Sequence, residues 1–197
     1  MTDPRPATTA HTLLPAIATR WSPRAYAATA VSDEALLCVL EAGRWASSCY
    51  NDQPWVFVAA RHGTPEFAAM LATLLPFNQV WAANAPVLLY SVARTHFAHN
   101  GEPNKHAWHD VGAATATMAI EASARAMQMH GMAGYDAAAA RSALAIPATH
   151  EPVTAFTLGF PGPASLLPEK LAEREAAPRA RRDAATMLFR GSWNAPL

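Results

Sequence analysis

The chain has 197 residues, of which 51% are hydrophobic and 15% are charged, and its fifteen Lys and Arg residues balance fifteen Asp and Glu residues. This composition supplies enough apolar side chains for a core and excludes intrinsic disorder, and the zero net charge disfavours general binding to nucleic acid or to an anionic membrane. With two cysteines, no secretory signal and no apolar run of about 18 residues, we expect one cytoplasmic domain over 1–197, stabilised without disulfides.

The first half of the chain predicts three helices and one strand between clear breaks. Helices are expected over residues 11–19, 33–46 and 64–75, and a short strand over 55–59. Ser32 precedes two acids and an apolar periodicity, and Thr64 precedes Pro65 and an acid, which are patterns typical of helix starts. The residue before Pro23 is pushed out of the helical region, so residues 20–26 should be extended or looped.

The second half predicts a central strand, a long apolar helix and a charged tail. Strands are expected over residues 87–92 and 153–158, and helices over 109–129, 136–144 and 169–175. The segment 109–129 consists mainly of Ala, Met, Ile and Thr with few charges, so it should lie in the core or in a subunit interface. Residues 187–197 are partly apolar without a domain of their own to bury them, and they should dock on this subunit or on another.

Three common catalytic and nucleotide-binding signatures are missing from the sequence. The chain contains no G-x-G-x-x-G, no G-x-x-x-x-G-K-[ST] and no G-x-S-x-G. A Rossmann dinucleotide site, a Walker phosphate loop and a nucleophile-elbow hydrolase are therefore disfavoured.

The arginines fall into two groups that could each contact an anion. In an extended chain, residues i, i+2 and i+4 point to one side, so Arg20, Ser22 and Arg24 can face one anion together. The same spacing applies to Arg179 and Arg181. A guanidinium offers a planar fork suited to phosphate, and a hydroxyl adds a neutral donor. Spacing alone also fits two solvated charged surfaces.

A group of histidines offers a second hypothesis. His96, His99, His106 and His109 lie close in sequence, with Asp110 beside the last of them. Imidazoles and a carboxylate on one helix face could hold zinc. A Gly-Glu-Pro-Asn stretch between the histidine pairs forbids one continuous helix, however, and no cysteine lies nearby. The alternative is a set of surface or pocket-lining histidines.

Aromatic residues gather near the predicted loops. They are Trp21, Tyr50, Trp55, Phe77 and Trp81. Such residues are either part of the core or a stacking wall for a planar ligand, and the sequence leaves both possibilities open.

Taken together, these segments resemble the FMN-dependent nitroreductase family. The matching stretches, in the family's order, are residues 20–26 (RWSPRAY), 41–55 (EAGRWASSCYNDQPW), 85–87 (APV), 110–114 (DVGAA), 132–136 (MAGYD) and 178–182 (PRARR). The resemblance implies an α+β, nitroreductase-like three-layer fold, with a central mixed β-sheet flanked by helices. It also implies a homodimer with two active sites at its interface, an interface helix over 109–129, and a C-terminal tail, 166–197, that docks on the partner subunit.

The resemblance further implies an FMN site built from both subunits. The residues expected to contact the cofactor are Arg20, Trp21, Ser22, Arg24, Ser47, Ser48, Cys49, Asn51, Asn78, Met132, Ala133, Gly134, Arg179 and Arg181, and those expected next to the substrate are Tyr50, Phe77 and Trp81. Arg20, Ser22, Arg179 and Arg181 would hold the phosphate and ribityl chain. Arg24 and Asn78 would approach the pyrimidine edge. Ser47, Ser48, Cys49 and Asn51 would face the flavin of the partner subunit. No catalytic side chain is expected, because the cofactor carries the chemistry.

The implied activity is that of an FMN-dependent oxidoreductase, which passes hydride from NAD(P)H via flavin N5 to an electron-poor acceptor, such as a nitroaromatic or a quinone, in a ping-pong cycle. Four positions depart from the family's pattern: Trp21 replaces a common Arg or His, Ser47 a common Pro, Trp81 a Lys of some members and Ala133 a Glu. These departures leave open another flavin reaction on the same fold, reductive dehalogenation or flavin fragmentation. The third hypothesis is a non-enzymatic ligand- or metal-binding protein that uses the His96–His109 cluster.

Overall fold

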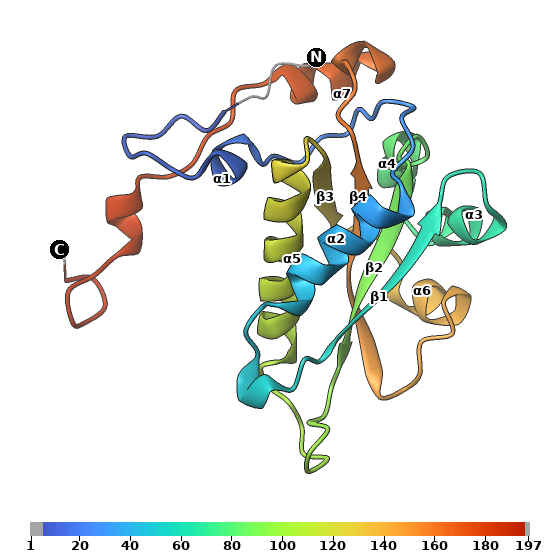
Figure 1. The fold of residues 1–197 in the computed structure, drawn as a ribbon. Helices are drawn as coiled ribbons and strands as arrows, with labels where there is room; N and C mark the ends of the chain where they lie inside the picture. Colours follow the sequence, from blue (N-terminus) through green and yellow to red (C-terminus); the bar gives the residue numbers. More distant parts are fainter. Residues whose placement is uncertain (1–5, 196–197) are drawn as a thin grey trace.

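A four-stranded sheet forms the middle of the molecule (Figure 1). The computed structural model describes residues 6–195, and its strands lie in the order β1 (Trp55–Arg61), β2 (Val87–Arg94), β4 (His150–Gly159) and β3 (Gln128–Met132). All three hydrogen-bonded pairs are antiparallel, so the expected mixed sheet is wrong for the described chain. Helix α5 (Ala107–Ala124) connects β2 to β3, which run in the same direction. Because β4 lies between them in the opposite direction, no parallel pair forms.

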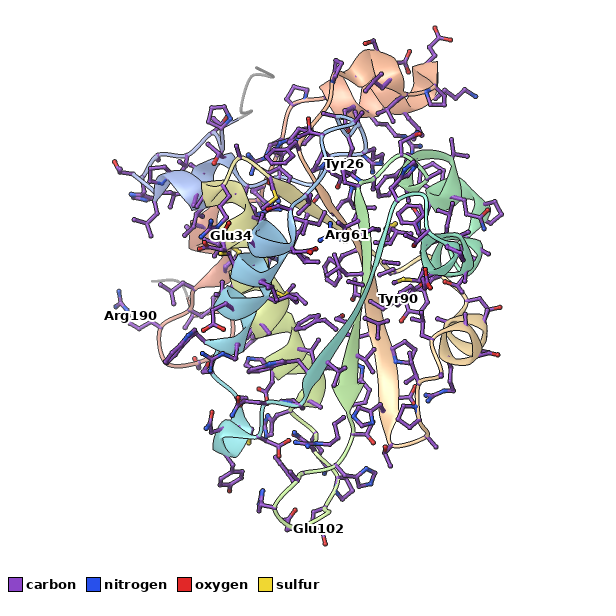
Figure 2. The ribbon with its side chains drawn as sticks, turned by 45° about the vertical axis from the view of Figure 1, so that its right-hand side comes forward. Tyr26, Glu34, Arg61, Tyr90, Glu102 and Arg190 are labelled. Atoms are coloured by element: carbon purple, nitrogen blue, oxygen red, sulfur yellow. The ribbon has the colours of Figure 1, made fainter. Side chains whose placement is uncertain are left out.

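Helices cover both faces of the sheet and give the expected three-layer α+β fold. On one face α2 (Asp33–Arg44) packs against α5, and on the other lie α3 (Pro65–Ala72), α4 (Pro76–Ala82) and α6 (Ala137–Ala143). The central strand β2 is buried almost throughout, because its side chains alternate between two cores. Val87 and Leu89 pack with residues of α2 and α5, whereas Leu88 and Tyr90 pack with residues of α3, α4 and α6. Tyr90 is labelled in Figure 2.

Short elements complete the chain. They are α1 (Pro15–Thr19), α7 (Glu169–Ala176) and the 3₁₀-helical turns η1 (Cys49–Asn51), η2 (Ala164–Leu166) and η3 (Ala184–Met187). Within residues 6–195, none of the helices is both long and apolar enough to cross a membrane.

Most predicted elements are confirmed, and side-chain caps explain where the helices start. The hydroxyl of Ser32 accepts a hydrogen bond from the N–H of Ala35 at 3.1 Å, and that of Thr64 accepts one from Phe67 at 3.2 Å. The Asp136 carboxylate accepts two hydrogen bonds from N–H groups in the first turn of α6. Each of these caps stands at the helix start that the sequence predicted.

Three segments differ from the sequence prediction. The helix expected over 109–129 ends at Ala124, because Ala126 adopts a left-handed conformation, with φ 59°, and the chain then enters β3. The helix expected over 64–75 ends at Ala72, and Pro76, expected to stop it, instead stands in the first turn of α4, which was not predicted. The first helix, expected over 11–19, is limited to α1.

After α7 the chain leaves the body of the molecule. In Figure 1 this segment passes α1 and ends away from the sheet. Its apolar side chains are uncovered: Met187 and Leu188 are about 55% exposed and Trp193 is 83% exposed. The expected docking of this tail on a partner subunit remains a prediction.

Candidate functional site

Two arginine-bearing segments from opposite ends of the chain meet beside α7. Together they line a pocket of about 310 Å³, which we call the anion pocket. Its lining residues are Arg20, Trp21, Ser22, Arg24, Arg174, Glu175, Ala177, Pro178, Arg179, Ala180 and Arg181. The two groups of arginines that the sequence singled out therefore converge within a single chain.

Hydrogen bonds to β3 and α7 hold the loop after α1 in place. The N–H of Trp21 donates to the side-chain oxygen of Gln128, at the start of β3, at 3.0 Å. The N–H groups of Arg24 and Ala25 donate to one carboxylate oxygen of Glu175 at 2.8 and 3.0 Å. Glu175 is buried and lies in the last turn of α7, so this carboxylate fixes the start of the tail relative to the loop.

The guanidinium groups in the anion pocket repel one another. Burial, followed by the charge of Arg181, lowers the pKa of Arg20. The pKa of Arg179 is lowered by burial and then by the charges of Arg20 and Arg181. Arg179 also donates to the carbonyls of Ala18 and Arg20, at 3.0 and 2.8 Å, which holds the tail against the loop. A bound anion would relieve the repulsion among these cations, so the pocket is suited to phosphate.

Arg24 carries a donor that the described chain does not use. Its Nη1 lies 3.8 Å from a carboxylate oxygen of Glu175. Its Nε is buried and has no hydrogen-bond partner among residues 6–195. A buried donor without an acceptor costs free energy, so a ligand oxygen that reaches this nitrogen would be stabilised.

An apolar pocket of about 380 Å³ adjoins the anion pocket and shares Arg20 and Ser22 with it. One wall is a face of α5 on which Gly112, Ala116 and Ala119 leave little side-chain bulk. An uncovered apolar surface beside a cationic pocket can receive the apolar part of a ligand or a second subunit.

A larger cavity, of about 510 Å³, also includes Arg24 in its wall. Its second arginine, Arg61, already pairs with the Asp33 carboxylate and with the carbonyl of Val31. Apart from Arg24, none of the residues expected to contact a cofactor or substrate lines this cavity. We therefore place the functional site at the smaller anion pocket, where the unneutralised positive charge is concentrated.

Residues 47–51 lie at the opposite end of α5 from the anion pocket. The N–H of Cys49 donates to the carboxylate of Asp110, in the first turn of α5, at 3.0 Å. Thr19, beside the anion pocket, contacts Ser123 in the last turn, with 3.0 Å between the hydroxyl oxygens. Between these two contacts the helix rises about 20 Å. In a single chain the arginines therefore do not meet the second expected group, Ser47, Ser48, Cys49, Tyr50 and Asn51.

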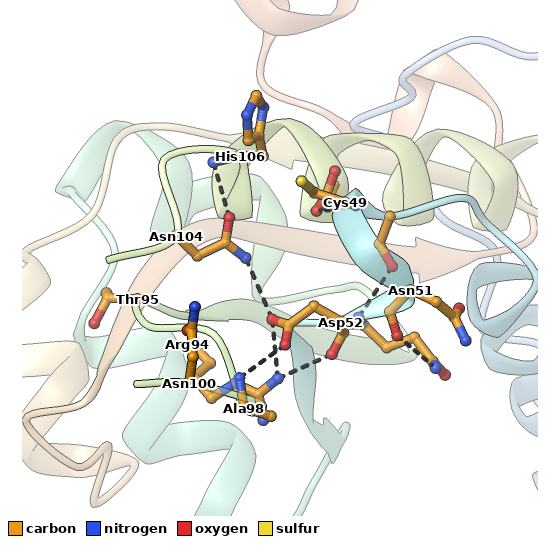
Figure 3. A network of polar contacts seen from close by, with 12 residues as sticks. Cys49, Asn51, Asp52, Arg94, Thr95, Ala98, Asn100, Asn104 and His106 are labelled. Atoms are coloured by element: carbon orange, nitrogen blue, oxygen red, sulfur yellow. Dashed lines mark hydrogen bonds and ion pairs between the residues drawn. The ribbon is translucent and has the colours of Figure 1, made fainter. Parts of the chain in front are cut away.

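A buried carboxylate holds the segment around Tyr50 (Figure 3). Asp52 accepts hydrogen bonds from the N–H of Ala98 at 2.9 Å and from the amide of Asn104 at 3.3 Å. It also pairs with Arg94 at 3.0 Å, and Arg94 donates to the Asp52 carbonyl at 2.9 Å. Burial raises the pKa of Asp52, but these donors outweigh it and bring the pKa below its ordinary value. Asp52 thus joins η1 to the loop between β2 and α5.

The same segment has a strained backbone. Tyr50, Asn51 and Gln53 have φ values of 53°, 54° and 47°, in the left-handed region that residues other than glycine rarely adopt. Tyr50 is 81% exposed, and the ring centres of Phe97 and His99 lie 5.8 and 5.6 Å from its own. An exposed aromatic ring on a strained backbone contributes little to the core, so this end of the molecule is a candidate binding surface.

A third expected group gathers where α4 meets the end of β3. It consists of Asn78, Met132, Ala133 and Gly134. The Gly134 carbonyl accepts hydrogen bonds from the N–H of Leu75 and from the Asn78 amide, both at 3.0 Å. A Cβ atom on Gly134 would lie 2.7 Å from the Asn78 amide nitrogen, so glycine permits this close approach. Met132 is buried, whereas Ala133 is exposed.

Trp81 does not line a substrate pocket, contrary to expectation. It is 0% exposed and stacks on His130, with 4.5 Å between the ring centres. Burial lowers the pKa of His130 to about 4, so the ring is neutral at pH 7 and its Nδ1–H donates to the Pro23 carbonyl at 2.8 Å. Trp81 is therefore a core residue, and through His130 it supports the loop after α1 that carries Arg20 and Arg24.

The histidines between His96 and His109 do not converge on a metal site. Across residues 6–195, no three His, Cys, Asp or Glu side chains come together in a way that could hold an ion. His99 packs on Tyr50, whereas His109 lies beside Asp110 on α5. The metal-binding hypothesis therefore has no structural support in this part of the chain.

Several residues that build the site were missed by sequence reasoning. They are Asp52, Arg94, His130, Arg174 and Glu175. Each of them acts through partners far away in sequence, and no local motif marks such contacts. Asp52 alone stood inside a stretch already singled out, residues 41–55.

Comparison with known proteins gives consistent matches. The model of the Nitroreductase family matches residues 17–160 of the chain. An uncharacterized 15.4 kDa protein of Mycolicibacterium smegmatis is 31% identical over 151 residues, which cover 72% of this chain and 99% of that protein. The crystal structure of an oxidoreductase containing FMN is 33% identical, with a TM-score of 0.91 over 99% of this chain and 100% of that one. A protein from Desulfovibrio desulfuricans, assigned as a nitroreductase and solved in complex with FMN, is 27% identical, with a TM-score of 0.72 over 90% of this chain and 95% of that one.

Proposed function

The chain belongs to the nitroreductase family, and on that premise we propose that it is an FMN-dependent oxidoreductase that takes electrons from NAD(P)H. It delivers them to an electron-poor acceptor such as a nitroaromatic or a quinone. The anion pocket carries this proposal, because its gathered guanidinium groups match the phosphate of FMN. Two similar structures that contain FMN support the choice of cofactor.

The residues of the anion pocket fit FMN. A phosphate monoester carries about −1.5 to −2 charges at pH 7. Burial and then mutual repulsion lower the pKa values of Arg20 and Arg179, and such a charge would offset both. Ser22 adds a hydroxyl donor at the pocket wall, and the Nε of Arg24 adds a buried donor that no acceptor of the described chain occupies. This donor set suits a ligand with a phosphate at one end and neutral oxygen acceptors farther along.

Each group of residues then has a defined task. Arg20, Ser22, Arg179 and Arg181 would bind the phosphate, and Arg24 and Asn78 would donate hydrogen bonds to the pyrimidine edge. The bond from Asn78 to the Gly134 carbonyl holds residues 132–134 in place beside α4. When bound, FMN supplies the electron transfer between the nicotinamide and the acceptor. The chain therefore needs to bind and orient its ligands, and no nucleophile or general base is required of it.

The site requires a homodimer, because one chain does not assemble all of its parts. The contact of Thr19, beside the anion pocket, and the contact of Cys49 lie about 20 Å apart along α5, so in our proposal the anion pocket and residues 47–51 reach one flavin from different subunits. The face of α5 with small residues and the uncovered Met187, Leu188 and Trp193 of the tail provide surface for that association.

The affinity for FMN of three variants, each of which loses one positive charge, tests the proposal. Arg20→Ala and Arg181→Ala should each weaken FMN binding roughly 10- to 150-fold, because a charge-assisted hydrogen bond contributes about 1.5–3 kcal/mol. Arg125→Ala is the control, since Arg125 pairs with Glu121 on the surface of α5 and does not line the anion pocket. Fluorescence titration of FMN measures all three. Unaltered affinity in the first two variants, or no FMN uptake by the unmodified protein, refutes the proposed site.

A second candidate function is a different flavin reaction on the same fold. It is favoured by Ala133, an exposed, uncharged residue in the group expected to contact the cofactor. Steady-state assays with nitroaromatic and quinone acceptors discriminate the two. Rapid reduction of the flavin by NAD(P)H without turnover of either acceptor class supports the second candidate.

A further inference from the structure

Arg174 adds a fifth guanidinium group to the anion pocket, on the side of α4. It directly precedes Glu175, whose buried carboxylate binds the N–H groups of Arg24 and Ala25. Because these bonds fix the last turn of α7, they also fix Arg174 at the pocket. Its guanidinium carbon lies 5.7 Å from the centre of the Phe77 ring, and Phe77 is 50% exposed.

The anion pocket holds more positive charge than one phosphate neutralises. Five arginines and one glutamate line it, which leaves four positive charges. A phosphate monoester brings about −1.5 to −2 charges. Roughly two positive charges therefore remain for a second anionic group.

Arg174 stands apart from the arginines assigned to the FMN phosphate. Arg179 donates to the carbonyls of Ala18 and Arg20, on the side of the loop after α1. The Arg174 guanidinium lies instead over the Phe77 ring of α4. Its close aromatic neighbour is Phe77, the residue expected beside the substrate. Arg174 therefore lies on the side of the pocket where the substrate is expected.

We propose that Arg174 binds a phosphate group of the reduced nicotinamide dinucleotide, with the exposed ring of Phe77 as the apolar surface beside it. This inference rests on the proposed function, since it concerns the electron donor of the FMN-loaded protein. The planar guanidinium fork suits phosphate oxygens. Two groups on the dinucleotide have this chemistry: the 2′-phosphate, which only NADPH carries, and the pyrophosphate, which NADH and NADPH share.

Nucleotide binding to the FMN-loaded protein tests the inference without turnover. Calorimetric titrations with NADP⁺ and NAD⁺ compare Arg174→Ala, Arg174→Lys and the control Lys170→Ala, which removes an exposed cation of the same helix that does not line the pocket. We expect Arg174→Ala to weaken binding roughly 10- to 150-fold, Arg174→Lys to restore part of the loss, and Lys170→Ala to have no effect. A loss confined to NADP⁺ assigns Arg174 to the 2′-phosphate, and an equal loss for both nucleotides assigns it to the pyrophosphate.

Two results overturn the inference. One is unchanged binding of both nucleotides by Arg174→Ala. The other is a loss of FMN from that variant, measured by the absorbance of released flavin. That loss would mean that Arg174 binds the phosphate of FMN and not that of the dinucleotide. Absence of FMN from the unmodified protein refutes the proposed function instead, so the two failures are distinguishable.

Discussion

Removal of the Asp52 carboxylate should be among the most destabilising single changes outside the hydrophobic core. The Asp52 side chain is 2% exposed, and its partner Arg94 is 30% exposed with a buried Nε that lacks an acceptor among residues 6–195. In Asp52→Ala the guanidinium keeps its charge in this partly buried position, and the N–H of Ala98 loses its acceptor. Truncating one partner of a buried ion pair costs about 3–5 kcal/mol, which we expect for this variant.

Urea unfolding at pH 7, at one protein concentration and equal FMN occupancy, measures this loss. Asp52→Asn keeps an acceptor oxygen but loses the charge, so it should cost less, about 1–3 kcal/mol. The control is Glu102→Gln, an exposed carboxylate in the same loop (Figure 2), which should change the free energy of unfolding by at most about 0.5 kcal/mol. A cost of less than about 1 kcal/mol for Asp52→Ala would mean that the pair is screened by solvent, and the reasoning would be refuted.

The Asp52–Arg94 pair also predicts that the free energy of unfolding depends on pH. Despite burial, the Ala98 N–H, Arg94 and Asn104 lower the pKa of Asp52 below its ordinary 3.8, so the folded protein binds this proton less tightly than the unfolded chain. The resulting stabilisation is fully present above the ordinary pKa and is lost as the pH falls through the folded-state value. Asp52→Asn should remove this part of the acid sensitivity in urea unfolding below about pH 4.

Three further changes probe other parts of the molecule. Burial lowers the pKa of His130 from 6.5 to about 4, so the free energy of unfolding should fall as the pH drops through that interval, and His130→Gln should flatten the curve. Trp81→Ala leaves a cavity beside His130 and should cost about 3–5 kcal/mol in urea unfolding; a loss near zero would show that the indole is not packed. Gly134→Ala places a Cβ atom 2.7 Å from the Asn78 amide, so FMN affinity in a fluorescence titration should fall, whereas unchanged affinity would separate this contact from the cofactor site.

The helix starts were predictable because their signals are local. Ser32 and Thr64 cap α2 and α3 with hydroxyls that reach an N–H three residues ahead. Strand β3 was missed because the alanine-rich sequence before it gives no sign of a stop. The helix ends there through the left-handed φ of Ala126, which is an unfavourable conformation for alanine and is imposed by the return of the chain to β4.

The site was only partly predictable, because its decisive contacts are long-range. Residue spacing indicated that each arginine group could bind an anion. Their meeting, however, depends on Glu175, which contacts Arg24 across 151 positions. The role of Trp81 was also not predictable, since the sequence does not distinguish an aromatic residue of the core from one that stacks on a planar ligand. Only its complete burial against His130 decides between the two.

The length of α5 links the architecture to the proposed assembly. Its contacts with Thr19, beside the cationic pocket, and with Cys49, in the strained segment that carries the exposed Tyr50, lie about 20 Å apart. A two-fold symmetric pair repeats every contact, and one association therefore completes two sites at once. It follows that FMN affinity should decline together with dimerisation when the protein is diluted, and a monomer that binds FMN with undiminished affinity would separate the cofactor site from the interface.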